Sequence, residues 1–210
     1  MDEMPRRKTS WRILVSTLVV GTLLATLHTT PATAATFNGE RLDFTKKMSP
    51  GTNIGYKIFP GNEYTSSIPA AINSLMYPPG SMSNPMVLWQ TTVTANSQMD
   101  FYQYSKSASD IVAYVEVFRK DDNGGGYYSM GAPAMDAFNW RYAEVWLNDA
   151  RMDELSTTKR RVTILHEMLH GYGLRDLKLA VNKASIMYAY TSGTATAMTA
   201  ETNTVLVTKY

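Results

Sequence analysis

Two histidines four residues apart are the side chains in this chain best suited to hold a metal ion. His166 and His170 lie in the segment HEMLHGYGLRD, residues 166–176, and a spacing of four puts both imidazoles on one face of a helix. Neutral imidazole nitrogens at this spacing form a two-point chelate for zinc. Glu167 lies beside them, where its carboxylate can reach a water on the metal rather than the metal itself. This is the position of a general base, and the segment predicts a hydrolytic zinc site.

A catalytic zinc ion usually has three protein ligands, and the third one here must be a carboxylate. The chain has no cysteine, and its third histidine, His28, lies in a segment that we expect to be removed. Asp176 follows His170 by six residues. Gly171 and Gly173 lie between them and can adopt the left-handed conformation that ends a helix and turns the chain back. The spacing therefore favours Asp176 as the third ligand.

Two alternatives stay open for this part of the site. Glu201, on a separate predicted helix, is the runner-up ligand, although it lies 31 residues beyond His170. Asp176 could instead be a solvated residue that pairs with Arg175 or Lys178. The two histidines could also lie on the surface of an amphipathic helix without any metal, but we favour the metal site because the motif uses both histidines expected in the mature chain.

The five residues His166, Glu167, His170, Gly173 and Asp176 fit the pattern H-E-x-x-H-x-x-G-x-x-D. This pattern resembles the zinc-binding consensus of the metzincin peptidases with Asp as the last ligand. The variant is similar to that of the snapalysins, which are small secreted bacterial proteases, and of some bacterial matrixin-like proteins. The resemblance implies a metzincin-like zincin domain with one catalytic zinc ion, and an endopeptidase in which a zinc-activated water attacks the peptide bond.

Downstream, residues 185–188 (Ser-Ile-Met-Tyr) resemble the Met-turn of metzincins, which would put Met187 beneath the zinc ligands. The alternative is an ordinary core methionine. Ala189 occupies the position at which astacins and serralysins have a metal-bound tyrosine, so that role is not assigned to Tyr188. The resemblance also implies that Val162 and Tyr188 line the pocket for the side chain after the cut. We expect this pocket to accept apolar side chains and to disfavour Asp and Glu.

The first 34 residues have the pattern of a cleaved signal peptide. Four basic residues between 6 and 12 precede an apolar run over 13–27, and Ala-Thr-Ala at 32–34 offers a cleavage site before Ala35. The alternative is an uncleaved membrane anchor, but the run is shorter than the roughly 20 residues that cross a bilayer. We therefore expect a secreted protein without stable membrane association.

Composition narrows the function classes further. The chain has 20 Lys and Arg against 18 Asp and Glu, and removing four basic and two acidic residues with the signal leaves 16 of each. A neutral chain has no basic excess to bind nucleic acid. The absence of cysteine excludes disulfides, iron–sulfur clusters and thiol nucleophiles. We expect a monomer that acts on protein or peptide substrates.

Elements of one α/β (α+β) domain surround the motif. Helical apolar stripes and runs of β-branched and aromatic residues predict about three helices and a twisted mixed sheet of about four or five strands. The almost continuously apolar run 111–118 predicts a central strand buried on both faces. The predicted strands are 54–59, 100–104, 111–118, 127–131 and 143–147, with a short apolar piece at 86–89, and the predicted helices are 68–76 with Ser67 as N-cap, 158–170, and 200–209 with Thr199 as N-cap.

The remaining segments carry weaker expectations. Residues 35–53 are polar and predict a loose N-terminal arm or a short propeptide before a catalytic domain over 54–210. The edge strand at 127–131 would bind an extended peptide by strand addition. Asp121, Asp122 and Asn123 could bind calcium, but a polar hairpin turn is favoured.

Alternative functions are a zinc amidase that acts on cell-wall peptides and a zinc-binding adhesion module without catalysis. The retained Glu167 speaks against the adhesion module.

Overall fold

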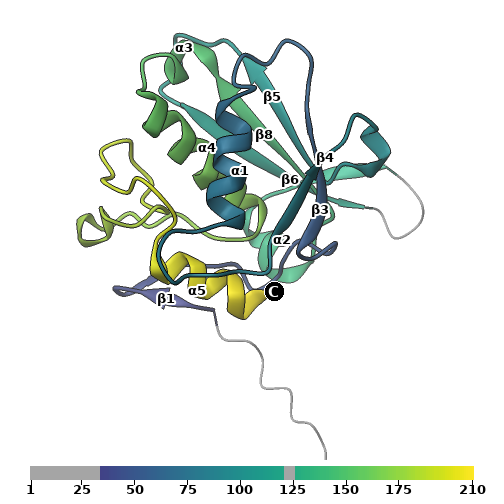
Figure 1. The fold of residues 1–210 in the computed structure, drawn as a ribbon. Coiled ribbons are helices and arrows are strands. Elements are labelled where there is room, and N and C mark those ends of the chain that lie inside the picture. Colours follow the sequence, from purple (N-terminus) through teal and green to yellow (C-terminus); the bar gives the residue numbers. More distant parts are fainter. Residues whose placement is uncertain (1–33, 121–125) are drawn as a thin grey trace, which may run out of the picture. The chain divides into compact units, whose positions relative to one another are not determined.

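A mixed sheet of six strands forms the frame of the domain (Figure 1). The computed structural model describes residues 34–120 and 126–210. In the strand order β4-β3-β5-β8-β6-β7, the first four strands run parallel, β6 is antiparallel to β8, and β7 is antiparallel to β6. The strands are β3 (Asn53–Ile58), β4 (Val87–Gln90), β5 (Met99–Tyr104), β6 (Ala113–Lys120), β7 (Tyr127–Met130) and β8 (Tyr142–Asn148). The expected α/β class with a mixed sheet is confirmed.

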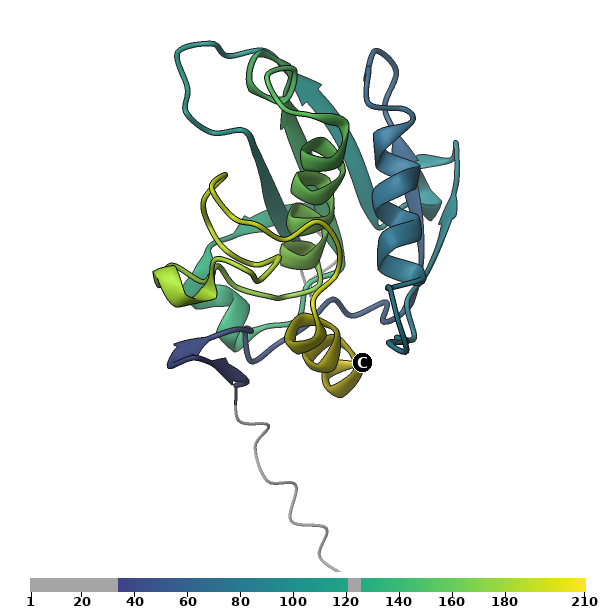
Figure 2. The ribbon, with the colours of Figure 1, turned by 60° about the vertical axis from the view of Figure 1, so that its left-hand side comes forward.

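Two helices, α1 (Ser67–Met76) and α4 (Thr157–Gly171), lie side by side on one face of this sheet (Figures 1 and 2). The helix α4, which carries the motif, packs on β6 and β8. The N-cap of α1 is Ser66, one residue before the expected Ser67, and its side chain makes no capping hydrogen bond. The other helices are α2 (Ala132–Ala137), α3 (Asp149–Met152) and α5 (Ala200–Lys209), and α5 has Thr199 as its N-cap.

For the main sheet the sequence predicted at least one strand too few, and for the described residues it predicted two α-helices too few. The short apolar piece at 86–89 forms the edge strand β4, which gives the main sheet six strands. The missed helices α2 and α3 have six and four residues, too few to show a helical stripe.

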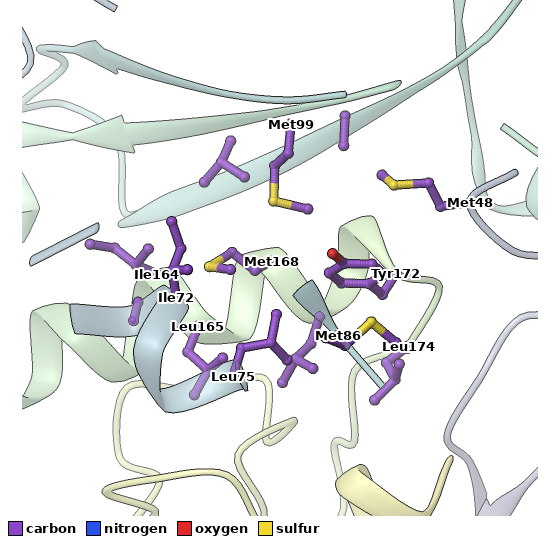
Figure 3. Packing of buried hydrophobic residues seen from close by; sticks show 14 of the residues in the cluster. Met48, Ile72, Leu75, Met86, Met99, Ile164, Leu165, Met168, Tyr172 and Leu174 are labelled. Carbon is purple, nitrogen blue, oxygen red and sulfur yellow. The ribbon is translucent and has the colours of Figure 1, made fainter. Parts of the chain in front are cut away.

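The core lies between the sheet and the two long helices (Figure 3). Apolar side chains of α1 and α4 pack beneath the sheet, and several residues of this core are methionines, whose flexible side chains fill irregular gaps. The residues labelled in this part of the core are Met48, Ile72, Leu75, Met86, Met99, Ile164, Leu165, Met168, Tyr172 and Leu174.

The prediction that 111–118 is a central strand buried on both faces was wrong. β6 is next to the last strand, and of its residues only Val117 is fully buried. Its outward face carries aromatic rings that stack on those of neighbouring strands, such as Tyr114 on Trp146 at 6.2 Å between centroids. β7 pairs with β6 only from Val117 onward. The first half of β6 is therefore an unpaired edge within the described chain.

Residues 35–53 also differ from the loose arm that their polarity predicted. Strands β1 (Thr36–Phe37) and β2 (Glu40–Arg41) form a small antiparallel hairpin. The next residues enter the domain, where the side chains of Leu42 and Met48 are fully buried in the core. This segment is therefore part of the folded domain.

Two other expectations fall outside the described residues. The predicted signal peptide lies there except for its last residue, and so does the candidate calcium segment 121–123. Among the residues described, no helix combines the length and the apolar character that a bilayer crossing requires.

A buried tyrosine at the end of α4 gives the first prediction. Among the described residues, the buried hydroxyl of Tyr172 has no hydrogen-bond partner. No hydrogen bond therefore offsets the free-energy cost of removing this hydroxyl from water. Tyr172→Phe should leave the free energy of unfolding unchanged or raise it by up to about 1 kcal/mol. Urea denaturation measures the difference.

Tyr210→Phe is the matched control. The hydroxyl of Tyr210 donates to the carbonyl of Tyr172 at 3.0 Å and accepts from the backbone N–H of Met48 at 2.9 Å. Its removal should lower the free energy of unfolding by about 1 to 2 kcal/mol. An equal loss in Tyr172→Phe would contradict the assignment of an unpartnered hydroxyl.

Candidate metal centre

The helix α4 presents the two motif histidines on one face. Ser156 caps its first turn, where the hydroxyl accepts from the backbone N–H of Lys159 at 3.3 Å. His166 and His170 follow one turn apart, with their Nε2 atoms 3.0 Å from each other and their rings perpendicular. The predicted helix and the predicted pair of side chains are both present.

Each imidazole is oriented by a backbone carbonyl on its other nitrogen. Nδ1 of His166 lies 2.7 Å from the carbonyl oxygen of Ile186, and Nδ1 of His170 lies 2.9 Å from that of Leu174. A carbonyl can only accept, so Nδ1 carries the proton and donates it. The lone pair of each neutral ring is then on Nε2, directed at the common point, as in metal-binding histidines.

The chain turns back after α4 at Gly173. Its φ of +92° lies in the left-handed region, and an added Cβ would come within 2.9 Å of the Trp140 ring. Gly171 does not adopt this conformation, so that part of the expectation was wrong. It is the last helical residue and lies close to β5, because an added Cβ would meet Met99 at 2.9 Å. The turn at Gly173 brings Asp176 against the histidines.

Three donor atoms form a nearly equilateral triangle. Oδ1 of Asp176 lies 3.2 Å from Nε2 of His166 and 3.3 Å from Nε2 of His170, while the two nitrogens are 3.0 Å apart. Ligand atoms about 2.0–2.2 Å from a tetrahedral zinc ion would lie about 3.3–3.6 Å from one another. The donor types are those that zinc accepts, and their separations lie at or slightly below this range. Within the described ranges, this is the one set of three or more His, Asp and Glu side chains close enough to hold an ion.

Charge in the cluster also favours a cation. Burial raises the pKa of Asp176, but the hydrogen bonds and charges of the two histidines outweigh it and hold this pKa well below its usual value. Burial lowers the pKa of His170, whereas Asp176 and the charge of Glu167 raise it to about 9. Without a metal, the site therefore retains a proton at neutral pH, and a divalent ion must displace it.

Glu167 is the least satisfied polar group of the site. Its side chain is 7% exposed, and no hydrogen bond or ion pair to its carboxylate is found among the described residues. Its oxygens are not among the fully buried atoms without a partner, so the carboxylate reaches the open pocket. It lines the same pocket as His166, as expected for a group that acts on a bound molecule.

A pocket of about 400 Å³ opens beside the triangle. Both residues expected there, Val162 and Tyr188, line it. Lys159 and Asp110 also line it, so charged groups lie beside the apolar ones, and the preference for apolar side chains stays a prediction. The Nζ of Lys159 donates to the backbone carbonyl of Gly193 on the opposite wall.

Helical spacing marks one of the pocket residues that the sequence analysis missed. Lys159 precedes Val162 by three positions and His166 by seven, so all three share one face of α4. Residues 110–113, before and at the start of β6, gave no such signal. Their place at the pocket depends on how the sheet is ordered, since β6 lies next to its edge.

Met187 is fully buried directly after the residue that orients His166. Its carbonyl accepts from the N–H of Leu177 at 2.8 Å, and the N–H of Ala189 donates to the carbonyl of Leu177 at 3.0 Å. The segment 185–189 thus contacts both the first histidine and the chain just after Asp176. This position is compatible with a Met-turn.

Neither Glu201 as the third ligand nor Arg175 as the ion-pair partner of Asp176 is found among the residues that the structure describes. The carboxylate of Glu201, at the start of α5, accepts from the Thr199 hydroxyl at 2.5 Å and is not part of the donor cluster. Arg175 pairs with Asp136 at 3.6 Å instead of with Asp176.

Comparison with known proteins identifies no family for this chain. No protein-family model matches the chain, and a search of curated proteins finds no significant match. The resemblance to metzincins therefore rests on the sequence motifs.

The donor triangle predicts which carboxylate holds the metal. Asp176→Ala should lower zinc affinity more than about 100-fold, because two imidazoles alone then remain, and the loss of a ligand costs more than the loss of a group that only orients one. Glu201→Ala is the matched control and should bind zinc as the wild type does. Zinc content after dialysis, measured by atomic absorption, separates the two, and Asp176→His should recover part of the affinity. Loss of zinc from Glu201→Ala but not from Asp176→Ala would refute the ligand assignment.

Proposed function

We propose that this protein is an exported, zinc-dependent endopeptidase of the metzincin type. The observation that carries the proposal is the triangle of His166 Nε2, His170 Nε2 and Asp176 Oδ1, with Nδ1 of both rings bound to backbone carbonyls. The unpartnered Glu167 beside it supplies the second requirement of hydrolysis, a base. The motif helix on a mixed sheet, followed by a turn at a left-handed glycine, supports a metzincin-like fold.

Each protein group has a separate task in this proposal. The two imidazoles and Asp176 would hold the zinc ion, which when bound supplies a Lewis acid and lowers the pKa of water. The carbonyls of Ile186 and Leu174 keep each imidazole in the tautomer that leaves Nε2 free. Glu167 takes a proton from the attacking water and passes it to the amine that leaves.

The substrate would bind along β6 instead of β7. β7 is an edge strand, but none of its residues lines the pocket, so the expectation for 127–131 is not supported. The N–H of Asn148 in β8 donates to the carbonyl of Val112, which directly precedes β6. In this register the even-numbered residues of β6 form the backbone hydrogen bonds to β8. By the alternation of an antiparallel ladder, Ala113 and Val115 direct their N–H and C=O groups to the unpaired side. An extended peptide can pair there and insert one side chain into the pocket.

This edge favours a protein substrate over the cell-wall amidase alternative, because strand addition recognises any extended backbone. Digestion of casein, compared with that of purified peptidoglycan, tests this choice. The adhesion module is disfavoured because it gives no role to Glu167, whose side chain lines the pocket beside His166.

Glu167→Gln tests the mechanism. The amide has nearly the shape of the carboxylate but cannot accept a proton, so we expect zinc content to stay at the wild-type value while kcat on a peptide substrate falls by ~10²-fold or more. A matched Glu63→Gln variant, changed at an exposed glutamate on another loop, should retain full activity. A fully active, zinc-loaded Glu167→Gln enzyme would exclude Glu167 as the base.

A further inference from the structure

The N-terminal segment contacts the chain on both sides of Asp176. On the near side, the N–H of Phe44 donates to the carbonyl of Gly173 at 2.9 Å, and the N–H of Arg175 donates to the carbonyl of Leu42 at 2.8 Å. Asp43 and Leu174 form an antiparallel bridge between these two bonds. Residues 42–44 thus fix the backbone that leads from the turn to the third ligand.

On the far side, a single carboxylate binds the chain just after Asp176. Both oxygens of Glu40 accept from the N–H of Lys178 at 2.9 Å, and Oε2 also accepts from the N–H of Leu179 at 2.9 Å. Oε2 accepts a further bond from Nδ2 of Asn182 at 2.6 Å. Partial burial raises the pKa of Glu40, but these hydrogen bonds outweigh it and lower this pKa, so the side chain is ionised at neutral pH.

Side-chain contacts also join the N-terminal segment to the chain around Asp176. The guanidinium of Arg41 binds the carboxylate of Asp136, which also lies 3.6 Å from Arg175. Arg175 stacks on the ring of Phe44, 4.6 Å from its centroid. The residue directly before Asp176 is therefore held by the N-terminal segment through its side chain as well as through its backbone.

The segment around Asp176 needs this support because it has little structure of its own. No helix or strand of the described chain includes residues 172–179. Leu174 and Leu177 are fully buried and fix the loop on either side of Asp176, but the side chain of Asp176 is 41% exposed and that of Leu179 is also exposed. Packing therefore does not fix the chain beyond Leu177, where the bonds of Glu40 lie. Apart from residues 40–44, its main backbone neighbour is the segment 187–189.

We propose that Glu40 is a positioning residue for Asp176, and that residues 35–48 are a permanent part of the metal site and not a removable propeptide. The proposal rests on the proposed function, because it takes Asp176 to be a metal ligand. Glu40 acts through the backbone of residues 178 and 179 and does not touch the metal. Its removal would leave two N–H groups and one amide without their acceptor and would loosen the chain that directly follows the third ligand.

Zinc affinity of Glu40 variants tests the proposal on the purified protein. Competition with a chromophoric chelator should give a zinc Kd raised about 10- to 100-fold in Glu40→Ala, the range for partners that orient metal ligands. Glu40→Gln should lie closer to the wild type, because its amide oxygen can still accept the bonds that now reach Oε2. Glu63→Ala, at an exposed glutamate, is the matched control, and Asp176→Ala is the reference for a lost ligand.

Cobalt distinguishes positioning from a general loss of stability. With Co²⁺ in place of zinc, the visible absorption of the Glu40→Ala protein should shift toward that of Asp176→Ala, because the carboxylate leaves the ion in part. A purely structural role would lower the unfolding temperature and leave the spectrum of the folded protein unchanged. If Glu40→Ala does not fold, the same comparison is made with Glu40→Gln.

The outcomes separate the two proposals. Wild-type zinc affinity and cobalt spectrum in folded Glu40 variants, with both altered in Asp176→Ala, would overturn the role of Glu40 and leave the metal site intact. Wild-type affinity in Asp176→Ala would instead refute the metal site itself. Isolation of an active protein that starts after residue 48 would overturn the permanence of the segment.

Discussion

A single helix can present two metal ligands in a line but cannot surround an ion with three. His166 and His170 lie one turn apart on α4, and a third side chain one turn further would extend the row along the helix axis. The third donor must therefore come from chain that has left the helix and turned back. Gly173 permits this turn with φ of +92°. The positions of the N-terminal segment and of residues 185–189 follow from it, since both hold the returning chain.

The same arrangement explains why the site favours a cation. Two carboxylates, Asp176 and Glu167, lie beside two imidazoles, whose protons on Nδ1 are bound by backbone carbonyls. The metal-free cluster lowers the pKa of Asp176 and raises that of His170, so it keeps a proton between them. A divalent ion would replace this proton and would leave Glu167 free to act as a base. The donor triangle thus depends on the return of the chain to α4, whereas Glu167, the proposed base, lies on that helix itself.

The sequence predicted the parts of this structure that are local. The helix, the histidine pair and the turn at Gly173 follow from spacing within fifteen residues, and five strands follow from apolar runs. The contact of Glu40 with residues 178 and 179 did not, because it joins polar groups 138 residues apart in sequence and no periodicity marks it. The run over 111–118 was misassigned because its aromatic residues, such as Tyr114, stack with Trp146 on the outer face instead of filling a core. The polar composition of residues 35–53 likewise gave no sign that Leu42 and Met48 are buried in the core.

Anomalous diffraction at the zinc absorption edge, from crystals grown with zinc, tests the central claim most directly. The account predicts one strong peak within bonding distance of Nε2 of His166, Nε2 of His170 and a carboxylate oxygen of Asp176, at about 2.0–2.2 Å from each. It also predicts that Glu167 lies beside this peak without binding it. A peak with Asp176 turned away and another protein side chain in its place, or no peak between the two histidines, would contradict the account.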